Sequence, residues 1–321
     1  MSTAWLQDLG GGVYAVDTAF QREHFDAAYL LRRDGRAAFI DTGTNFGVPR
    51  LLQALQVLGI PRDAVDWVIP THVHLDHAGG VGLLMQELPT ATLLVHPRGV
   101  RHLVDPGALY QGALAVYGAE EMARSYGELR PVPAGRVQAS SDEQVVLLGG
   151  SPLRLIDTPG HARHHHCIWD EHTRGWFTGD TFGLSYREFD TERGAWIMPT
   201  STPVQFEPEV LRLSVQRLLQ ADPQCMYLTH FSRVTGVPRL AALLLGLLDE
   251  TVALGRACAA LPAAQRHQQL KQGLLALYRA SLADHGCHLD TATLARLLEL
   301  DIELNAQGIA IWLDRESRPR A

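Results

Sequence analysis

The chain is poor in cysteine and has no long apolar run. Four cysteines stand far apart in 321 residues and form no CxxC pair. We therefore expect reduced, mostly buried thiols, as in a cytoplasmic protein, and neither a disulfide framework nor a cysteine zinc site. The apolar run 240–248 is about half as long as a membrane span requires, so it predicts a buried helix and no membrane partner.

Positive charge is also scarce. The chain has 28 Lys and Arg against 35 Asp and Glu, a formal charge of −7, and Lys271 is its single lysine. This balance argues against a protein that works by neutralising nucleic-acid phosphates. The first residues lack a basic stretch followed by an apolar one, so no secretory signal is expected. These absences leave a globular protein that acts on a small molecule in the cytoplasm.

One decapeptide concentrates side chains that bind metals. Residues 71–80 read Thr-His-Val-His-Leu-Asp-His-Ala-Gly-Gly, an HxHxDH core. Histidine and aspartate are ligands for borderline divalent metals such as zinc. The apolar run 67–69 predicts a buried strand that Pro70 ends, so His72 and His74 point the same way from an extended segment. A solvated polar loop is the alternative, but so dense a cluster favours a metal site.

Three further strand ends carry ligand-type residues. Apolar segments lead into His161 through Asp-Thr-Pro-Gly, into Asp180 through Phe-Thr-Gly, and into His230 through Leu-Thr. A single histidine after a strand is more often an ordinary surface residue. Four such ends in one chain favour one shared site, because loops at strand ends are where binding sites form.

The series THVHLDH, DTPGH, FTGD and LTH resembles the metallo-β-lactamase superfamily over about residues 10–235. The order, the spacing and the strand context all agree with that family. The resemblance implies an α/β fold, an αββα sandwich with two sheets between helices. It also implies two divalent metal ions, with zinc expected and iron or manganese as alternatives. The implied ligands are His72, His74 and His161 for one ion, Asp76, His77 and His230 for the other, and Asp180 as the bridge.

The resemblance also implies roles around the metals. Asp76 and Asp180 are the expected catalytic carboxylates, and Asp41 matches a position that supports the site from behind the ligands. Tyr186 is a guess for a donor to the oxyanion, with a packing role as the alternative. Near it, Arg187 is a guess for attracting an anionic substrate. We also expect His164 or His165 to buttress a ligand without binding metal.

The expected activity is hydrolysis of an ester, lactone or thioester by a hydroxide that bridges the two metals. Phosphodiester hydrolysis and an iron-dependent reaction with oxygen or a persulfide are the alternatives. Relatives of the glyoxalase II type follow the bridging aspartate with Gly-Cys-Gly-Lys or Gly-Cys-Gly-Arg, whereas Asp180 precedes Thr-Phe-Gly-Leu. This departure argues against a glutathione thioester. The run HARHHH at 161–166 is similar to that of a less characterised, glyoxalase II-like bacterial and archaeal group.

The chain alternates strands and helices in its first two-thirds and is helical thereafter. We expect a metallo-β-lactamase-like domain over 1–237 and a helical region over 238–321 packed on it. Helical spacing predicts helices at about 239–260, 263–285 and 290–310. Residues 100–131 interrupt the alternation and are read as a lid over the substrate, with plain core packing as the alternative. The leucine-rich helical faces suit a homodimer contact or packing within the chain.

Overall fold

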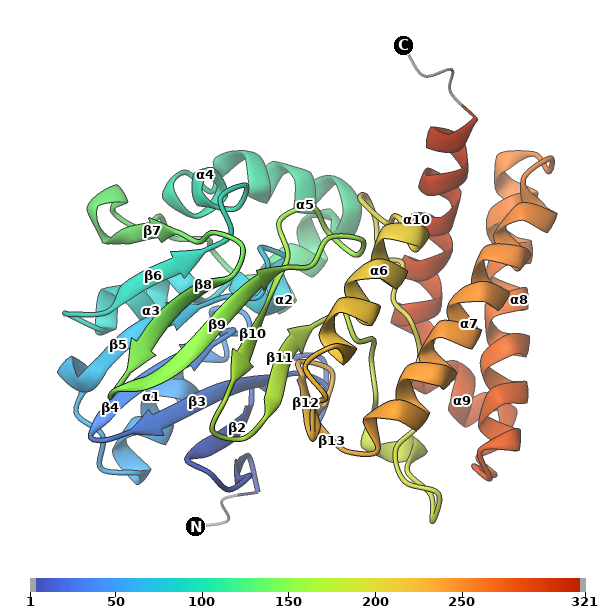
Figure 1. Cartoon of the computed structure of the whole chain (residues 1–321). Helices are drawn as coiled ribbons and strands as arrows, with labels where there is room; N and C mark the ends of the chain where they lie inside the picture. The colour runs from blue at the N-terminus through green and yellow to red at the C-terminus, as the bar shows by residue number, and fades with distance from the viewer. Residues whose placement is uncertain (1–3, 318–321) are drawn as a thin grey trace. The chain divides into compact units, whose positions relative to one another are not determined.

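The computed structural model describes residues 4–317, which fall into two compact units (Figure 1). The first unit runs to Asp157 and also includes His164–Gly179 and Pro223–Val234. The second unit comprises Thr158–Arg163, Asp180–Asp222 and the residues from Thr235 onward.

Two mixed β-sheets form the centre of the first unit. One has the strand order β1-β2-β3-β4-β5-β6-β7 and the other the order β13-β12-β11-β10-β9-β8. The strands of the first sheet are β1 (Leu6–Asp8), β2 (Val13–Asp17), β3 (Ala27–Arg33), β4 (Arg36–Ile40), β5 (Val65–Ile69), β6 (Thr92–Val95) and β7 (Val137–Ala139). Those of the second are β8 (Gln144–Leu148), β9 (Ser151–Asp157), β10 (His166–Asp170), β11 (Gly175–Gly179), β12 (Cys225–Leu228) and β13 (Ser232–Val234).

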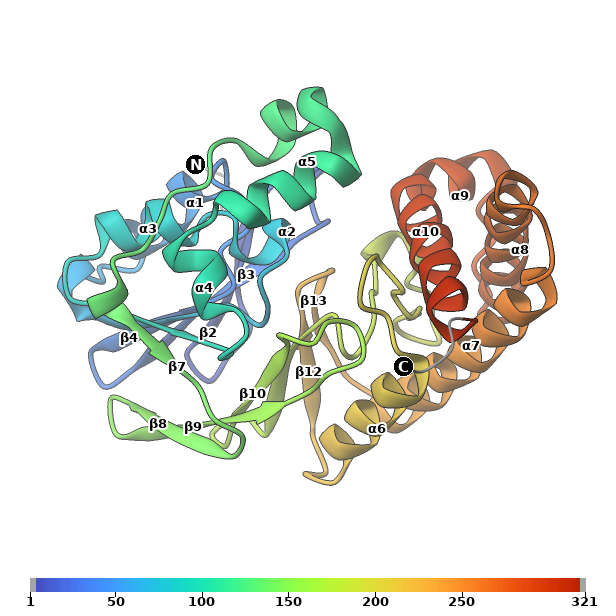
Figure 2. The same cartoon turned by 90° about the horizontal axis from the view of Figure 1, so that it is seen from above.

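Apolar side chains cover both faces of the first sheet. On one face, residues of β3, β4 and β5 pack against α1 (Val48–Val57) and α3 (Val81–Glu87), which lie over this sheet in Figure 2. On the other face, Tyr29 and Ile40 pack with Phe177 and Tyr227 of the second sheet. A sheet buried on both faces explains why its central strands read as continuous apolar runs. With the helices that flank the sheets and extend the C-terminus, this architecture confirms the predicted fold class.

Turn chemistry agrees with the strand prediction. The β3–β4 hairpin turns at Asp34 and Gly35, whose φ angles of 44° and 78° are both positive, as a two-residue type I′ turn requires. Strand β5 ends at Ile69, directly before Pro70. Because β4 and β5 run parallel, their carboxyl ends lie at the same edge of the sheet. The loops that begin at Asp41 and Thr71 therefore start side by side.

The remaining helices of the first unit are short, apart from one. They are α2 (Leu75–Ala78), α4 (Val100–Val104) and α5 (Gly107–Glu121), with a π-helical turn at Met122–Tyr126 and 3₁₀ turns at Arg62–Ala64 and Ala134–Arg136. The segment expected at 100–131 is thus largely helical.

The second unit is helical. It contains α6 (Pro208–Leu219), α7 (Val237–Cys258), α8 (Ala263–Asp284), α9 (Thr291–Leu297) and α10 (Glu299–Glu316), together with a 3₁₀ turn at Arg187–Phe189. Segment 180–207 belongs to this unit because it bonds to the helices. The Trp196 indole N–H donates to Ser281 Oγ at 2.9 Å, and the Ser201 N–H donates to Asn305 Oδ1 at 2.6 Å. Contacts therefore group residues 180–222 with the C-terminal helices, whereas the sequence placed the division after residue 237.

The prediction of one helix over 290–310 was wrong. Asp290 begins α9 by accepting hydrogen bonds from the backbone N–H groups of Ala292 and Thr293. Leu298 then leaves helical geometry, with φ −106° and ψ 9°, and α10 continues from Glu299 to Glu316. Leu298 is fully buried. Its side chain packs in the core while the backbone turns there, which the helical spacing of apolar residues does not reveal.

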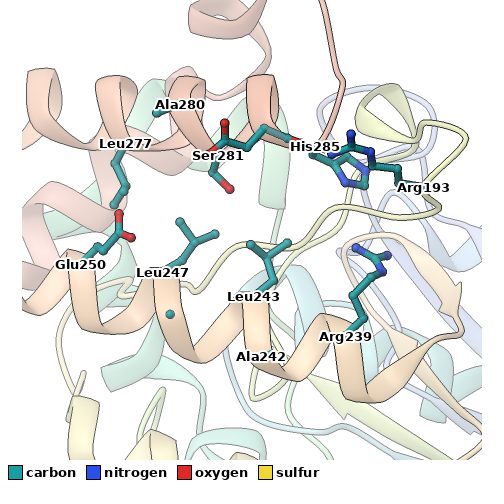
Figure 3. Close-up of a pocket in the computed structure, with 12 residues that line it drawn as sticks. Arg193, Arg239, Ala242, Leu243, Leu247, Glu250, Leu277, Ala280, Ser281 and His285 are labelled. Carbon is teal, nitrogen blue, oxygen red and sulfur yellow. Dashed lines mark hydrogen bonds between the residues drawn. The ribbon is translucent and has the colours of Figure 1, made fainter.

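Helices α7 and α8 border a surface groove of about 460 Å³ (Figure 3). Leu243 and Leu247 line its middle, Leu277 lies at one end beside Glu250, and Arg193 and Arg239 lie at the other end. Between residues 4 and 317, every helix lacks either the length or the apolar content needed to cross a bilayer. The four cysteines are free thiols, as expected.

Candidate metal centre

The HxHxDH segment lies at the carboxyl edge of the first sheet, where it follows β5 and ends within α2. His74 directly precedes α2, so Asp76 and His77 fall in its single turn. The His72 Nε2 and His74 Nδ1 atoms are 2.8 Å apart, and the rings of His72 and His77 are 4.0 Å apart. His72 and His77 are fully buried. The segment thus holds its histidines against one another, as the alternating spacing predicted.

Three of the predicted ligands converge within the first unit. The Asp76 Oδ2 atom lies 3.7 Å from His77 Nε2 and 3.5 Å from His230 Nε2. His230 follows β12 by two residues and reaches the loop from the second sheet. One donor atom from each of these three residues falls within 4.8 Å of the others, a spacing that suits a shared metal ion. Two imidazoles and a carboxylate fit zinc, iron or manganese.

A buried carboxylate stands behind His77. The Nδ1 atom of His77 is 2.9 Å from Asp41 Oδ2. Asp41 also accepts the Thr71 backbone N–H at 2.7 Å and the Thr229 hydroxyl at 2.7 Å. With Nδ1 held in this way, Nε2 is the ring atom turned toward Asp76, and the tautomer that presents Nε2 to a metal is favoured. Asp41 therefore lies where the sequence placed it, in contact with a ligand.

A second buried carboxylate, Asp26, stands behind His230. Asp26 Oδ1 is 2.5 Å from His230 Nδ1, and Asp26 is fully buried. The two residues meet because the Ala27 N–H donates to the Thr229 carbonyl at 2.8 Å, which joins the start of β3 to the end of β12. The sequence analysis missed Asp26. Its single local signal is a charged residue directly before the apolar strand 27–31.

The environment of Asp26 is costly for a charge. Burial raises the pKa of Asp26 to about 6, although the neighbouring His230 favours the carboxylate and lowers it. Asp41 and Asp26 thus contact His77 and His230, respectively, on the side of each ring opposite to Asp76. The Nδ1 atoms are bound to buried carboxylates, and the Nε2 atoms face the aspartate that can share a metal with them.

The three histidines of the run 164–166 make different contacts near this group. The ring of His165 stacks on that of His72, with centroids 4.8 Å apart. His164 Nδ1 accepts the Val73 N–H at 3.4 Å, and burial lowers the pKa of His164. His166 lies in β10, as predicted, where its Nε2 donates to the Pro70 carbonyl at 2.9 Å. Contacts with the HxHxDH segment are thus made by both residues expected to buttress a ligand.

The remaining predicted ligands, His161 and Asp180, are grouped with the second unit by their contacts. Their side chains lie together, with His161 Nε2 3.4 Å from Asp180 Oδ2. His161 sits in the short excursion Thr158–Arg163 between two segments of the first unit. Asp180 is joined by one peptide bond to Gly179, the last residue of β11. A Cβ at Gly179 would meet Thr71 Oγ1 at 2.5 Å, and φ is +46°, so glycine is needed there.

Tyr186 and Arg187 are engaged within the second unit. The Tyr186 hydroxyl is buried and donates to Asp301 Oδ1 of α10 at 3.0 Å. Arg187 donates to the Ser185 carbonyl at 2.6 Å and pairs with Asp190 at 3.4 Å. These contacts tie both side chains to their own unit, and the roles suggested for them in binding substrate stay predictions.

Comparison with known proteins gives a consistent family. Residues 23–230 match the family model described as the metallo-beta-lactamase superfamily. The chain is 28% identical over 172 residues to a metallo-beta-lactamase fold-containing protein of Sulfurisphaera tokodaii, covering 52% of this chain and 61% of that one. It is 26% identical over 189 residues to an acyl-coenzyme A thioesterase of Gallus gallus, covering 54% and 63%. The matches thus span less than two thirds of either relative.

A solved structure extends the likeness to the fold. A metallo-beta-lactamase family protein of Thermus thermophilus superposes with a TM-score of 0.67 at 19% identity, covering 96% of this chain and 95% of that one. The family match covers more than half of the chain and includes both the HxHxDH segment and His230. The chain therefore belongs to the metallo-β-lactamase superfamily.

Proposed function

We propose that this protein is a metal-dependent hydrolase that cleaves a thioester of a small molecule. One observation carries the proposal. Asp76 Oδ2 and the Nε2 atoms of His77 and His230 converge, while buried Asp41 and Asp26 hold the opposite nitrogens of the two rings. Such carboxylate–histidine pairs orient imidazoles for a metal and raise their basicity as ligands.

We propose a second ion beside the first, which makes the centre dinuclear. Two observations support this extension: Asp180 directly follows Gly179, which packs against Thr71 just before the HxHxDH segment, and His161 lies 3.4 Å from Asp180. In this proposal Asp180 would be shared by the two ions, for which zinc is the first expectation. The proposed ligands are His72, His74 and His161 for one ion and Asp76, His77 and His230 for the other.

Divalent ions held by these residues would lower the pKa of the attacking water and polarise the carbonyl oxygen. The side chains then have two tasks. Asp76 and Asp180 would orient the attacking water toward the acyl carbon, and Asp180 would accept a proton from that water as the carbon–oxygen bond forms. The carbon–sulfur bond breaks and the proton passes to the thiolate, so the products are a carboxylic acid and a thiol. Buried Asp26 and Asp41 keep the ligand rings from turning during these steps.

The choice of a thioester rests on the relatives. The Gallus gallus protein similar to this chain is named as an acyl-coenzyme A thioesterase, and two fungal relatives are also named as thioesterases. A thiolate is also a good leaving group, because a thiol has a pKa near 8.5. Oxygen esters and lactones are hydrolysed by the same type of reaction, so the test must distinguish them from thioesters.

The test begins with metal analysis of protein purified from its native source, because zinc leaves the protein colourless whereas an iron centre absorbs visible light. The zinc-loaded protein is then assayed with acyl-coenzyme A thioesters, aryl esters and acyl-homoserine lactones. We expect thioester turnover that falls by at least about a hundredfold in Asp76→Ala. Asp17→Asn, a change at a buried carboxylate bound to the backbone N–H groups of Ala19 and His24, serves as the control. Zinc-loaded protein without thioester turnover would refute the proposal.

A further inference from the structure

Helix α5 is an apolar helix with no buried residue. Its sequence Gly-Ala-Leu-Tyr-Gln-Gly-Ala-Leu-Ala-Val-Tyr-Gly-Ala-Glu-Glu has charge only in its last two residues, yet none of its side chains is buried in the described structure. A helix of this composition normally covers a core with one face. Contiguous apolar surface left uncovered in a folded protein marks a binding site.

Four of the partly covered residues of α5 form one stripe. Tyr110, Ala113, Leu114 and Tyr117 are half-buried, as are Leu109 and Glu121, whereas Ala115 and Val116 are exposed. The spacing i, i+3, i+4, i+7 places the four on a single face. We call these four residues the α5 stripe. It carries no charged group, so it suits an apolar ligand and offers nothing to a charged one.

A row of aromatic rings joins the α5 stripe to the metal centre. Tyr117 packs on Tyr126 with ring centroids 5.0 Å apart, and Tyr126 packs on Phe20 at 5.4 Å. Phe20 packs on Phe25 at 5.9 Å, and Phe25 meets the ring of His230 edge-on at 5.5 Å. All of these residues belong to the first unit. The α5 stripe is thus continuous, ring by ring, with a proposed metal ligand.

A kink within α5 and the turn after it produce this continuity. Gly118 has φ 79° and ψ 163°, which no other residue type adopts readily, and it kinks the chain directly after Tyr117. The π-helical turn that follows returns Tyr126 to the ring of Tyr117. Tyr126 is buried, and its ring contacts Tyr117 on one side and Phe20 on the other. Tyr126 therefore links α5 to Phe20 and Phe25, and Phe25 contacts His230.

We propose that the α5 stripe binds the apolar acyl chain of the substrate, so that the enzyme prefers medium and long acyl thioesters to short ones. This inference rests on the proposed thioesterase function and specifies its substrate. The acyl chain fits better than a second copy of the protein because the aromatic row leads from the stripe to the reacting centre. Each methylene that the stripe removes from water should raise kcat/KM by up to about fourfold.

The experiment compares two substitutions on one helix. Leu114→Asp places a charge in the α5 stripe, and Val116→Asp places the same charge on its exposed side, where Val116 is already 38% exposed. Both variants are assayed with butanoyl-, octanoyl- and dodecanoyl-coenzyme A. We expect wild type and Val116→Asp to prefer the dodecanoyl substrate. Leu114→Asp should lose at least tenfold in kcat/KM for that substrate and keep its rate with the butanoyl one.

Competition by free fatty acids tests the stripe apart from catalysis. Displacement of a fluorescent fatty acid by dodecanoate should weaken at least tenfold in Leu114→Asp and stay unchanged in Val116→Asp. Equal loss of activity on all chain lengths, or unchanged dodecanoate binding, would overturn the inference. So would a wild-type dimer that Leu114→Asp converts to monomers without altering chain-length preference. If dodecanoate binds as expected but no thioester is hydrolysed, the proposed function fails and the acyl-chain site stands.

Discussion

Replacing Asp26 by Asn should move metal affinity and stability in opposite directions. Asp26 is fully buried, and its Oδ1 lies 2.5 Å from His230 Nδ1. Asn keeps the shape of the side chain and removes its charge. Carboxylates that hold a ligating histidine typically contribute 10- to 100-fold to metal affinity, or about 1.4–2.7 kcal/mol. The Asp76–His77–His230 site should therefore bind zinc more weakly by that factor, measured by competition with a chromogenic chelator.

Without metal, the same substitution should stabilise the protein. Burial raises the pKa of Asp26 from its ordinary 3.8 to about 6, so the folded state disfavours the carboxylate. The cost develops as pH rises from about 4 to 6 and stays constant above that range. A shift of this size corresponds to roughly 3 kcal/mol at neutral pH, an upper bound on the gain in urea unfolding of metal-free Asp26→Asn at pH 7.

The matched control is Asp17→Asn. Asp17 is also buried, but its oxygens accept the backbone N–H groups of Ala19 and His24 and touch no proposed ligand. Its substitution should leave zinc affinity unchanged and should not stabilise the metal-free protein. If Asp26→Asn binds zinc as tightly as wild type, Asp26 does not position His230, and the argument from paired carboxylates is refuted.

Three further substitutions test other parts of the structure. Asp41→Ala should cost at least about 3 kcal/mol in urea unfolding, because it strips the acceptor from buried donors that include the Thr71 N–H; a loss under 1 kcal/mol would contradict the hydrogen bonds described. Asp170→Ala should cost about 3–5 kcal/mol, since it leaves the Arg33 guanidinium, now paired at 2.7 Å, buried without its partner; the double change with Arg33→Met should recover part of that loss. Burial lowers the pKa of His285 below its ordinary 6.5, so the unfolded chain takes up its proton first and stability falls as pH drops below 6.5. His285→Gln should flatten that dependence in thermal melts between pH 5 and 7, and an unchanged slope would argue against it.

Much of the fold follows from short-range patterns. The Asp34-Gly35 pair predicts its hairpin, because few residues other than glycine and asparagine or aspartate adopt the positive φ that the turn needs. Pro70 ends β5 where the sequence indicated, because proline cannot donate a ladder hydrogen bond. The first apolar face of the C-terminal region predicts α7. These features depend on a few neighbouring residues, and local sequence contains them completely.

Other features depend on contacts between distant segments. Helical spacing predicted one helix over 290–310. The structure instead divides α9 from α10 at Leu298, whose side chain is buried in the core where the backbone leaves helical geometry. Segment 180–207 carries no helical pattern, yet it belongs with the helices through bonds such as that of Trp196 to Ser281. The sequence showed the tyrosines of segment 100–131, which is still only predicted to be a lid, but it did not show which residues would share a face of α5.

The sequence alone determined the family and proposed a set of ligand-type residues, because the HxHxDH spacing and the strand ends are local and specific. The tertiary structure decided which of these groups meet. The Thr229 hydroxyl reaches Asp41 across 188 residues of chain, and the neighbouring pairing of β3 with the end of β12 sets Asp26 against His230. The physical reason is burial. A carboxylate becomes a partner for a ligand when folding removes it from water and leaves an imidazole within hydrogen-bonding distance.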